Sequence, residues 1–196
     1  LVGSEMCIRD SPNIVYLAPT NKEEYIAMME WGIEQDKYPV AIRVPNINVV
    51  STGISVEPDF YNINTYKKVE NGKDIAIIGL GNFYHIGKKV KEKLKSEIGV
   101  NATLINPRFI SGIDEKLLYE LLEEHKLVIT LEDGVIEGGF GEKISRFYGD
   151  KNIKVLNFGA DKEFTNGVSK DELYERYHLT EELIAVSYTH LTLPTT

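Results

Sequence analysis

The sequence predicts an α/β fold with an open, mostly parallel sheet and one antiparallel edge strand, preceded by a separate βαβ unit. From residue 74 onward, short continuously apolar runs alternate with amphipathic helical patterns. Such runs are typical of parallel strands covered on both faces. A strand–helix–strand pattern before residue 46 is followed by an irregular segment, so it forms a unit of its own.

Composition narrows the function classes. The 196 residues include 22 Lys and Arg against 30 Asp and Glu, a formal net charge of −8. This balance argues against a partner that is a nucleic acid or a membrane surface, because both are anionic. No apolar run approaches the roughly 20 residues of a membrane span. Cys7 is the single cysteine, so we expect no disulfide within the chain and no cysteine zinc cluster.

The two ends do not look like parts of the fold. Residues 1–11 and 186–196 show neither helical nor strand periodicity and resemble translated sequencing adapters. We therefore expect the natural sequence to cover residues 12–185 and to be cut at both ends.

Residues 13–44 predict the βαβ unit. The apolar run 13–18 and the run 40–44 are the expected parallel strands. Between them, Thr20 and Glu23 have the spacing of a capping box at a helix start. The expected buried face of that helix consists of Tyr25, Met28, Met29 and Ile33.

Residues 12–50 are assigned to this first unit, 51–64 to a linker and 65–185 to the α/β domain. Residues 46–64 have no period, which favours an irregular connection. Residues 66–70 alternate and are followed by Asn71-Gly72, a strong hairpin signal. We expect this edge strand to fold back antiparallel onto the strand at 74–79.

Four strand–helix repeats follow. The expected strands are 75–78, 103–105, 127–131 and 154–158, each a short apolar run. Asp114 and Ser169 are placed as N-caps of helices behind them.

Two glycine-rich turns have compositions that resemble anion-binding sites. Residues 79–82 (GLGN) follow a strand, but the third glycine of a dinucleotide fingerprint is replaced by Tyr84, which favours a tight turn capped by Asn82. Residues 138–141 (GGFG) share their loop with the acidic Glu132, Asp133 and Glu137, whose charge repels anions. We expect these glycines to allow close backbone approach and Glu132 to serve a structural hydrogen bond.

The three histidines of the natural part predict no metal site. His85, His125 and His178 lie on different segments without paired ligand spacing. His125 is expected at a helix C-terminus, where the helix dipole favours it. No serine nucleophile motif or P-loop is present, so the residues alone leave open a non-catalytic dimerisation or nucleotide-binding module.

Six segments in order resemble the C-terminal end of the thiamine-diphosphate-dependent, transketolase-like enzymes, in particular the branch that makes 1-deoxy-D-xylulose 5-phosphate. They are NIVYLAPTNKEEY (13–25), YPVAIRVP (38–45), DIAIIGLGNF (74–83), ATLINPRFISGID (102–114), VITLEDGVIEGGFG (128–141) and KVLNFG (154–159). The C-terminal part of a transketolase or of a 2-oxo-acid dehydrogenase beta subunit is the alternative.

The resemblance implies a cytoplasmic, homodimeric transferase that condenses pyruvate with glyceraldehyde 3-phosphate with decarboxylation. It implies thiamine diphosphate and Mg²⁺ as cofactors, and a product that feeds isoprenoid, thiamine and pyridoxal phosphate synthesis. Residues 12–50 would then be the end of the pyrimidine-binding domain. No catalytic, cofactor-binding or metal-binding residue is expected within this segment, so the chain alone is expected to be inactive.

One residue is expected to bind substrate. Arg43 matches the first arginine of the family's Arg-Tyr-Pro-Arg-Gly motif, whereas Asn46 stands where the second arginine helps to bind the acceptor's phosphate. A neutral amide cannot replace a bidentate guanidinium at a phosphate. We also expect exposed apolar surface around the strands of Ile14 and Val40, which would have lost sheet neighbours.

Overall fold

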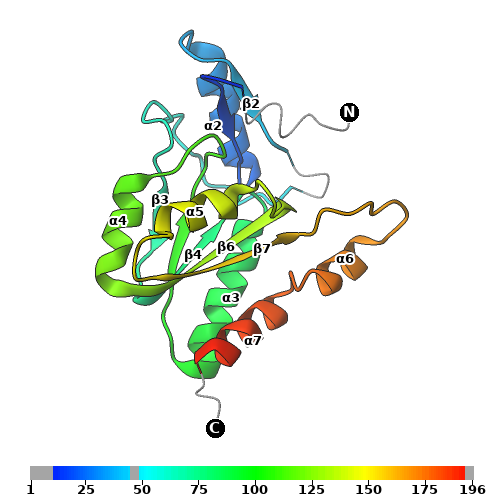
Figure 1. The fold of residues 1–196 in the computed structure, drawn as a ribbon. Coiled ribbons are helices and arrows are strands. Elements are labelled where there is room, and N and C mark those ends of the chain that lie inside the picture. The colour runs from blue at the N-terminus through cyan, green and yellow to red at the C-terminus, as the bar shows by residue number, and fades with distance from the viewer. Residues whose placement is uncertain (1–10, 45–48, 193–196) are drawn as a thin grey trace.

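The computed structural model describes residues 11–44 and 49–192. It consists of a small βαβ unit and a five-stranded α/β domain, with the unit lying above one end of the larger sheet (Figure 1). Three segments lie outside the described residues, namely 1–10, 45–48 and 193–196. The first and last belong to the adapter-like ends, and the middle one contains Asn46.

The first unit is the expected parallel βαβ. Strand β1 (Val15–Leu17) pairs with β2 (Val40–Ile42), and helix α2 (Lys22–Glu34) connects them. The other edge of β1 is also paired, because the Ala18 amide donates to the Arg108 carbonyl at 2.8 Å. β1 is therefore buried, and the expectation of exposed apolar surface on this strand is wrong. β2 is half-buried.

Helix α2 begins one residue later than predicted. The Asn21 side chain accepts from the Glu24 amide at 2.8 Å, so Asn21 is the N-cap and Thr20 is not. Glu23 instead accepts from the Thr52 and Gly53 amides. The predicted buried face is wrong for Ile33, which is 78% exposed, and for Met29. The residues that α2 buries are Glu24, Ala27, Met28 and Trp31.

Residues 49–64 contain no regular helix or strand, as predicted, yet they are not a solvated linker. Phe60 is 1% exposed and its ring lies 6.1 Å from that of Trp31 and 6.4 Å from that of Phe109. Because Trp31 belongs to α2 and Phe109 to the larger domain, Phe60 joins the two parts in one apolar cluster.

The large sheet has the order β3-β5-β4-β6-β7. Its strands are β3 (Lys67–Glu70), β4 (Asp74–Gly79), β5 (Thr103–Asn106), β6 (His125–Val135) and β7 (Lys154–Ala160). All pairs are parallel except β3–β5. The fold class is confirmed.

The predicted hairpin is wrong, because β3 pairs with β5 and not with β4. The turn after β3 packs against the start of β5. The Lys73 amide donates to the Asn101 carbonyl at 3.0 Å, and a Cβ on Gly72 would lie 2.0 Å from that same oxygen. Gly72 thus serves a close approach to a neighbouring segment, which a local hairpin signal cannot distinguish from a two-residue turn.

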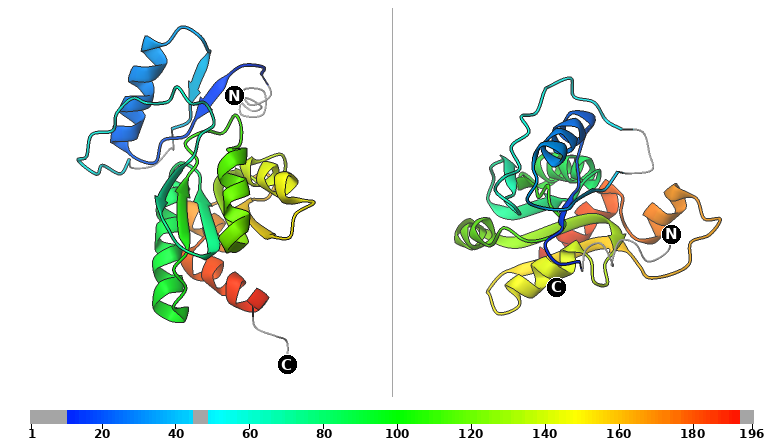
Figure 2. Two further views of the ribbon diagram at one scale, coloured as in Figure 1. Left: turned by 90° about the vertical axis from the view of Figure 1, so that its left-hand side faces the viewer. Right: turned by 90° about the horizontal axis from the view of Figure 1, so that it is seen from above.

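Helices cover both faces of this sheet, as the left view of Figure 2 shows. Helix α3 (Phe83–Ile98) and helix α7 (Glu181–Thr192) pack on one face through Val90, Leu94 and Ile184. Helix α4 (Glu115–Glu124) and helix α5 (Phe140–Tyr148) pack on the other through Leu118, Leu121 and Ile144. Helix α6 (Lys170–Arg176) precedes α7.

The helix ends partly follow the predictions. The Asp114 side chain accepts from the Leu117 amide and the Ser169 side chain from the Glu172 amide, which confirms both N-caps. Helix α7 continues past Ala185 to Thr192, into the adapter-like segment, because no glycine or proline interrupts it before Pro194.

In the part of the chain that the structure describes, no helix is long and apolar enough to cross a membrane.

Candidate functional site

The sheet topology defines where a ligand is expected. The chain leaves β4 toward β5 on one side and leaves β6 toward β7 on the other, so connections diverge between β4 and β6. In open α/β sheets, ligands bind at the carboxyl ends of the strands at such a switch point. Here this edge is formed by the turn at 79–82 and the loop at 132–139.

The chain itself covers part of this edge. A Cβ on Gly81 would lie 3.5 Å from the Ala18 Cβ and 3.7 Å from the Pro19 carbonyl oxygen. One turn further along α3, His85 Nε2 lies 2.7 Å from the Thr20 carbonyl oxygen. The β1–α2 connection therefore packs directly on the β4–α3 turn, where an open α/β domain ordinarily receives a ligand.

Arg43 adds a charged contact at the same edge. Its amide donates to the Leu17 carbonyl at 2.8 Å, which extends the β1–β2 pairing. Its guanidinium Nη1 lies 2.8 Å from Oδ1 of Asp133 in the loop after β6, and the side chains of the two residues are only 21% and 24% exposed. The predicted substrate-binding residue is thus ion-paired with the larger domain.

A buried carboxylate joins the two parts a second time. Glu24 Oε2 accepts from the Thr20 amide at 2.8 Å and from the Thr20 hydroxyl at 2.9 Å, and Oε1 accepts from Asn106 Nδ2 at 2.9 Å. Glu24 and Asn106 are both buried. Sequence reasoning missed this contact. The available signal was an acidic residue on the apolar face of α2, in register with Ala27, Met28 and Trp31.

Glu132 has the structural role that the sequence predicts. Its two carboxylate oxygens accept from the Phe140 amide at 2.9 Å and the Gly141 amide at 2.8 Å, at the N-terminus of α5. A Cβ on Gly139 would lie 2.6 Å from Glu132 Oε1. The glycine-rich loop therefore makes room for the chain's own carboxylate at the positive end of a helix.

The turn at 79–82 is tight, as predicted, but Asn82 does not cap it. Asn82 occupies the N-cap position of α3 with a helical backbone, and its side chain makes no capping hydrogen bond. The turn is closed instead by backbone bonds, with the Phe83 amide donating to the Leu80 carbonyl and the Tyr84 amide to the Gly81 carbonyl. Gly81 has φ +56°, a conformation that glycine adopts without strain.

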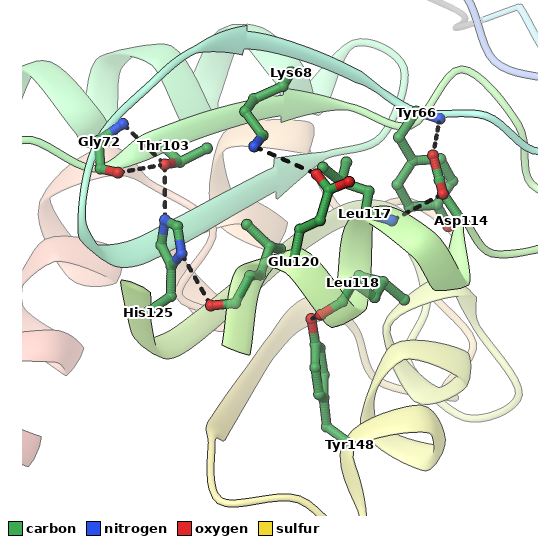
Figure 3. Close-up of polar contacts among 11 residues, drawn as sticks. Tyr66, Lys68, Gly72, Thr103, Asp114, Leu117, Leu118, Glu120, His125 and Tyr148 are labelled. Carbon is green, nitrogen blue, oxygen red and sulfur yellow. Dashed lines mark hydrogen bonds and ion pairs between the residues drawn. The ribbon is translucent and has the colours of Figure 1, made fainter. Parts of the chain in front are cut away.

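His125 lies at the C-terminus of α4, as predicted (Figure 3). It is the first residue of β6, so it lies at the amino ends of the parallel strands, away from the turn at 79–82. Its Nδ1 is 3.0 Å from the Leu121 carbonyl oxygen, which can only accept, so Nδ1 carries the proton. Its Nε2 is 2.8 Å from the Thr103 hydroxyl, which also accepts from the Gly72 amide. Burial lowers the pKa of His125. These bonds connect α4 and the start of β6 with β5 and with the turn between β3 and β4.

Figure 3 also shows that helix α4 is fixed at its other end. Asp114 Oδ2 accepts from the Tyr66 amide at 2.9 Å, while the Tyr148 hydroxyl donates to the Leu118 carbonyl at 2.7 Å. Burial raises the pKa of both tyrosine hydroxyls. These groups fix the packing of α4.

The histidines are not brought together. His178 follows the C-cap of α6 and has a φ of +56°, and His85 and His125 lie at opposite ends of the parallel strands. Within residues 11–44 and 49–192, no three His, Cys, Asp or Glu side chains are grouped as metal ligands.

These features define the class of protein. It is a doubly wound α/β domain whose usual ligand edge is packed against a preceding βαβ unit. Residues 64–184 match the model of the transketolase C-terminal domain, and the chain belongs to that family.

The curated relatives indicate a particular branch. The chain is 34% identical over 182 residues to the 1-deoxy-D-xylulose-5-phosphate synthase of Shouchella clausii, which covers 91% of this chain and 28% of that protein. It is 35% identical over 176 residues to the synthase of the same name from Clostridium tetani, with 88% and 28% covered. The resemblance stated from the sequence is confirmed, and the chain spans about 28% of the length of these relatives.

Solved structures share the fold. A split-gene transketolase, described as an inactive beta4 tetramer, has a TM-score of 0.77 at 25% identity and covers 93% of this chain and 59% of that one. A transketolase variant from Pichia stipitis has a TM-score of 0.68 at 15% identity and covers 94% and 26%.

Proposed function

We propose that this chain is the C-terminal region of a 1-deoxy-D-xylulose-5-phosphate synthase. The complete protein would be a cytoplasmic, homodimeric transferase that condenses pyruvate with glyceraldehyde 3-phosphate and releases carbon dioxide. The observation that carries the proposal is identity of 34% to a synthase of that name across 91% of this chain. Residues 12–50 would end the pyrimidine-binding domain, 51–64 would link it to the domain at 65–185, and the adapter-like ends would be foreign.

Thiamine diphosphate and Mg²⁺ belong to the proposal only through the complete protein. When bound, thiamine diphosphate supplies the electron sink for carbanion chemistry. The described residues of this chain do not fit either group, because they contain no cluster of metal-ligating side chains and the α5 amides of Phe140 and Gly141 already bind Glu132. Both groups would be held by the remainder of the protein.

The proposed contribution of this chain is therefore support of the site. Arg43 would contact the acceptor substrate at the end of β2, and its ion pair with Asp133 supports a fixed position for the guanidinium. Asn46 would leave the acceptor's phosphate to cationic groups elsewhere in the protein, because an amide carries no charge.

A chimera tests this function. Residues 12–185 would replace the matching C-terminal region of the Shouchella clausii synthase, and product formation from pyruvate and glyceraldehyde 3-phosphate would be measured with and without thiamine diphosphate. We expect cofactor-dependent product, and an Arg43→Gln chimera with a higher KM for glyceraldehyde 3-phosphate and a nearly unchanged kcat.

The same chimera separates the second candidate. The structural likeness to a split-gene transketolase supports a transketolase C-terminal region instead. A folded, dimeric chimera that transfers a two-carbon unit from a ketose phosphate but makes no 1-deoxy-D-xylulose 5-phosphate would contradict the synthase proposal.

A further inference from the structure

The sequence contains two Asn-Gly pairs, Asn71-Gly72 and Asn166-Gly167. Asparagine is one of the chemically labile residues of proteins. Its side-chain carbonyl can be attacked by the backbone nitrogen of the next residue, and glycine hinders this attack least because it has no Cβ. The attack also needs a backbone N–H that is not held in a hydrogen bond and a chain that can rotate. The structure distinguishes the two pairs on both points.

The first pair is held by β5 and the residues before it. The Gly72 amide donates to the Thr103 hydroxyl at 2.9 Å. The Asn71 carbonyl accepts from Asn101 Nδ2 at 3.1 Å, and the Lys73 amide donates to the Asn101 carbonyl at 3.0 Å. A Cβ on Gly72 would lie 2.0 Å from that carbonyl oxygen, so the backbone has no room to rotate. The nitrogen that would attack Asn71 is therefore bonded and fixed.

The second pair lies in the loop between β7 and α6, which extends away from the rest of the domain (Figure 1). Asn166 and Gly167 are both exposed, and a Cβ on Gly167 would meet nothing within 4 Å. The Val168 amide donates to the Thr165 carbonyl at 3.1 Å and closes a turn around the pair. Within the described part of the chain, opening this one bond is enough to release the Gly167 nitrogen for attack.

The two ends of this loop are anchored, and its middle is solvated. Glu163 pairs with Arg176 at 3.1 Å and accepts from the Tyr177 hydroxyl, while Ser169 caps α6. Between these anchors Phe164 is 97% exposed, so even the largest side chain of the middle lies in solvent and does not restrain the loop. Local opening of such a segment costs little free energy.

We propose that Asn166 is a site of spontaneous deamidation and that the fold protects Asn71. A bond forms between the Gly167 nitrogen and Asn166 Cγ, the Cγ–Nδ2 bond breaks, and ammonia leaves with the proton of the Gly167 amide. Water then opens the resulting cyclic imide at either of its two carbonyls, which gives aspartate or isoaspartate. Both products add a carboxylate to the loop. The proposal does not depend on the proposed synthase function.

The test follows both asparagines in the full chain at mildly alkaline pH, once folded and once in concentrated urea. Trypsin releases them in separate peptides, 69–73 and 163–170, each with a single asparagine. Replacement of the NH₂ group by OH raises the peptide mass, and liquid chromatography separates the aspartate and isoaspartate forms. Subtraction of the value at time zero removes the deamidation that occurs during digestion.

The expected result is a difference that appears only on folding. In urea the two pairs should react at rates within about threefold of each other, because both are then solvated Asn-Gly sequences. Folding should slow Asn71 by about a hundredfold, since three net hydrogen bonds must open, and Asn166 by no more than about fivefold, the opening of one. A folded chain in which Asn166 is slowed as strongly as Asn71 would overturn the proposal.

Thr103→Val tests the protection of the first pair. It removes the acceptor of the Gly72 amide, so Asn71 should react about fivefold faster in the folded chain while Asn166 keeps its rate. Circular dichroism like that of the unchanged chain shows that the variant is folded. An unchanged rate at Asn71 in the folded variant would contradict protection by this bond.

Gly167→Ala tests the attacking nitrogen of the second pair. It adds a Cβ beside that nitrogen and should slow Asn166 at least about threefold, folded or unfolded. Gly53→Ala is the matched control, because Gly53 shares the positive φ and the open surroundings of Gly167 but follows a threonine. Its two rates should equal those of the unchanged chain. Deamidation of Asn166 at the same rate in Gly167→Ala would overturn the proposed chemistry.

Discussion

Glutamine in place of Glu24 removes the buried charge at the junction between the βαβ unit and the α/β domain. The carboxylate faces only donors, namely the Thr20 amide, the Thr20 hydroxyl and Asn106 Nδ2. A glutamine can place its oxygen at the Oε2 position, but its NH₂ group then faces Asn106 Nδ2. Asn106 cannot turn over without a loss, because its Oδ1 accepts from the Arg108 amide at 3.0 Å.

The expected loss of stability follows from the hydrogen bonds that each substitution removes. One charge-assisted hydrogen bond is lost, so Glu24→Gln should lower the free energy of unfolding by about 2 kcal/mol. Glu24→Ala leaves the buried Asn106 amide without its acceptor and opens a cavity, so about 4 kcal/mol is expected. Glu30→Gln is the control, since Glu30 is exposed on the same helix, and it should stay within about 0.5 kcal/mol.

Urea denaturation read by two signals measures this effect. Trp31 is the single tryptophan of the chain and is buried in the βαβ unit, so its fluorescence follows that unit. Far-UV circular dichroism follows mainly the larger domain. We expect coincident transitions in the unchanged chain and a shift of both in Glu24→Gln. A Glu24→Gln variant as stable as Glu30→Gln would refute the assignment of Glu24 as a joint.

Three further changes test other parts of the account. Gly139→Ala should destabilise the chain by several kcal/mol because its Cβ would lie 2.5 Å from a backbone oxygen, whereas Gly149→Ala, with 3.5 Å, should be nearly neutral by thermal denaturation. Phe60→Ala should cost about 4 kcal/mol in urea, and Phe164→Ala, 97% exposed, under about 0.5; equal effects would contradict the packing of the 49–64 segment. The pKa of His125 is lowered in the folded state, so its stabilisation holds above the unfolded value of about 6.5 and is lost as pH falls below it. Stability should therefore fall more steeply from pH 7 to 5 in the unchanged chain than in His125→Gln, and parallel profiles would exclude this residue as the cause.

The sequence predicted the elements that depend on local patterns. The strands around Ile77 and Ile129 are continuous apolar runs because helices cover them on both sides, and the caps Asp114 and Ser169 are followed by amphipathic helices. Parallel pairing followed from the alternation of strands and helices. None of these inferences needs a contact between distant residues.

The wrong predictions, of the hairpin and of the N-cap of α2, have the same cause, because contacts between residues far apart in the sequence decide both. Asn71-Gly72 has the composition of a hairpin turn, but the approach of Gly72 to Asn101 decides that β3 pairs with β5. Thr20 and Asn21 are both good caps, and only the bonds of Glu24 decide between them.

The candidate site was predicted less completely than the fold. Arg43 was singled out through its motif, but its pairing with Asp133, 90 positions later, could not be read from a pattern. Glu132 stands at the carboxyl end of a strand, where a functional role was the alternative to the expected structural hydrogen bond, and its bonds to α5 confirm the structural role. The Glu24–Asn106 contact joins the βαβ unit to the α/β domain. The pattern of apolar residues in the sequence does not indicate how these two parts are placed relative to each other.

Reading the coding sequence upstream of Pro12 in the source DNA tests the central claim most directly, since the claim is that this chain supports a site built elsewhere in the same protein. We predict an open reading frame that continues upstream for more than twice the length of this chain and encodes the Gly-Asp-Gly metal motif expected from the family resemblance. A gene that starts near Pro12, with no such motif ahead of it or in a neighbouring gene, would contradict the account.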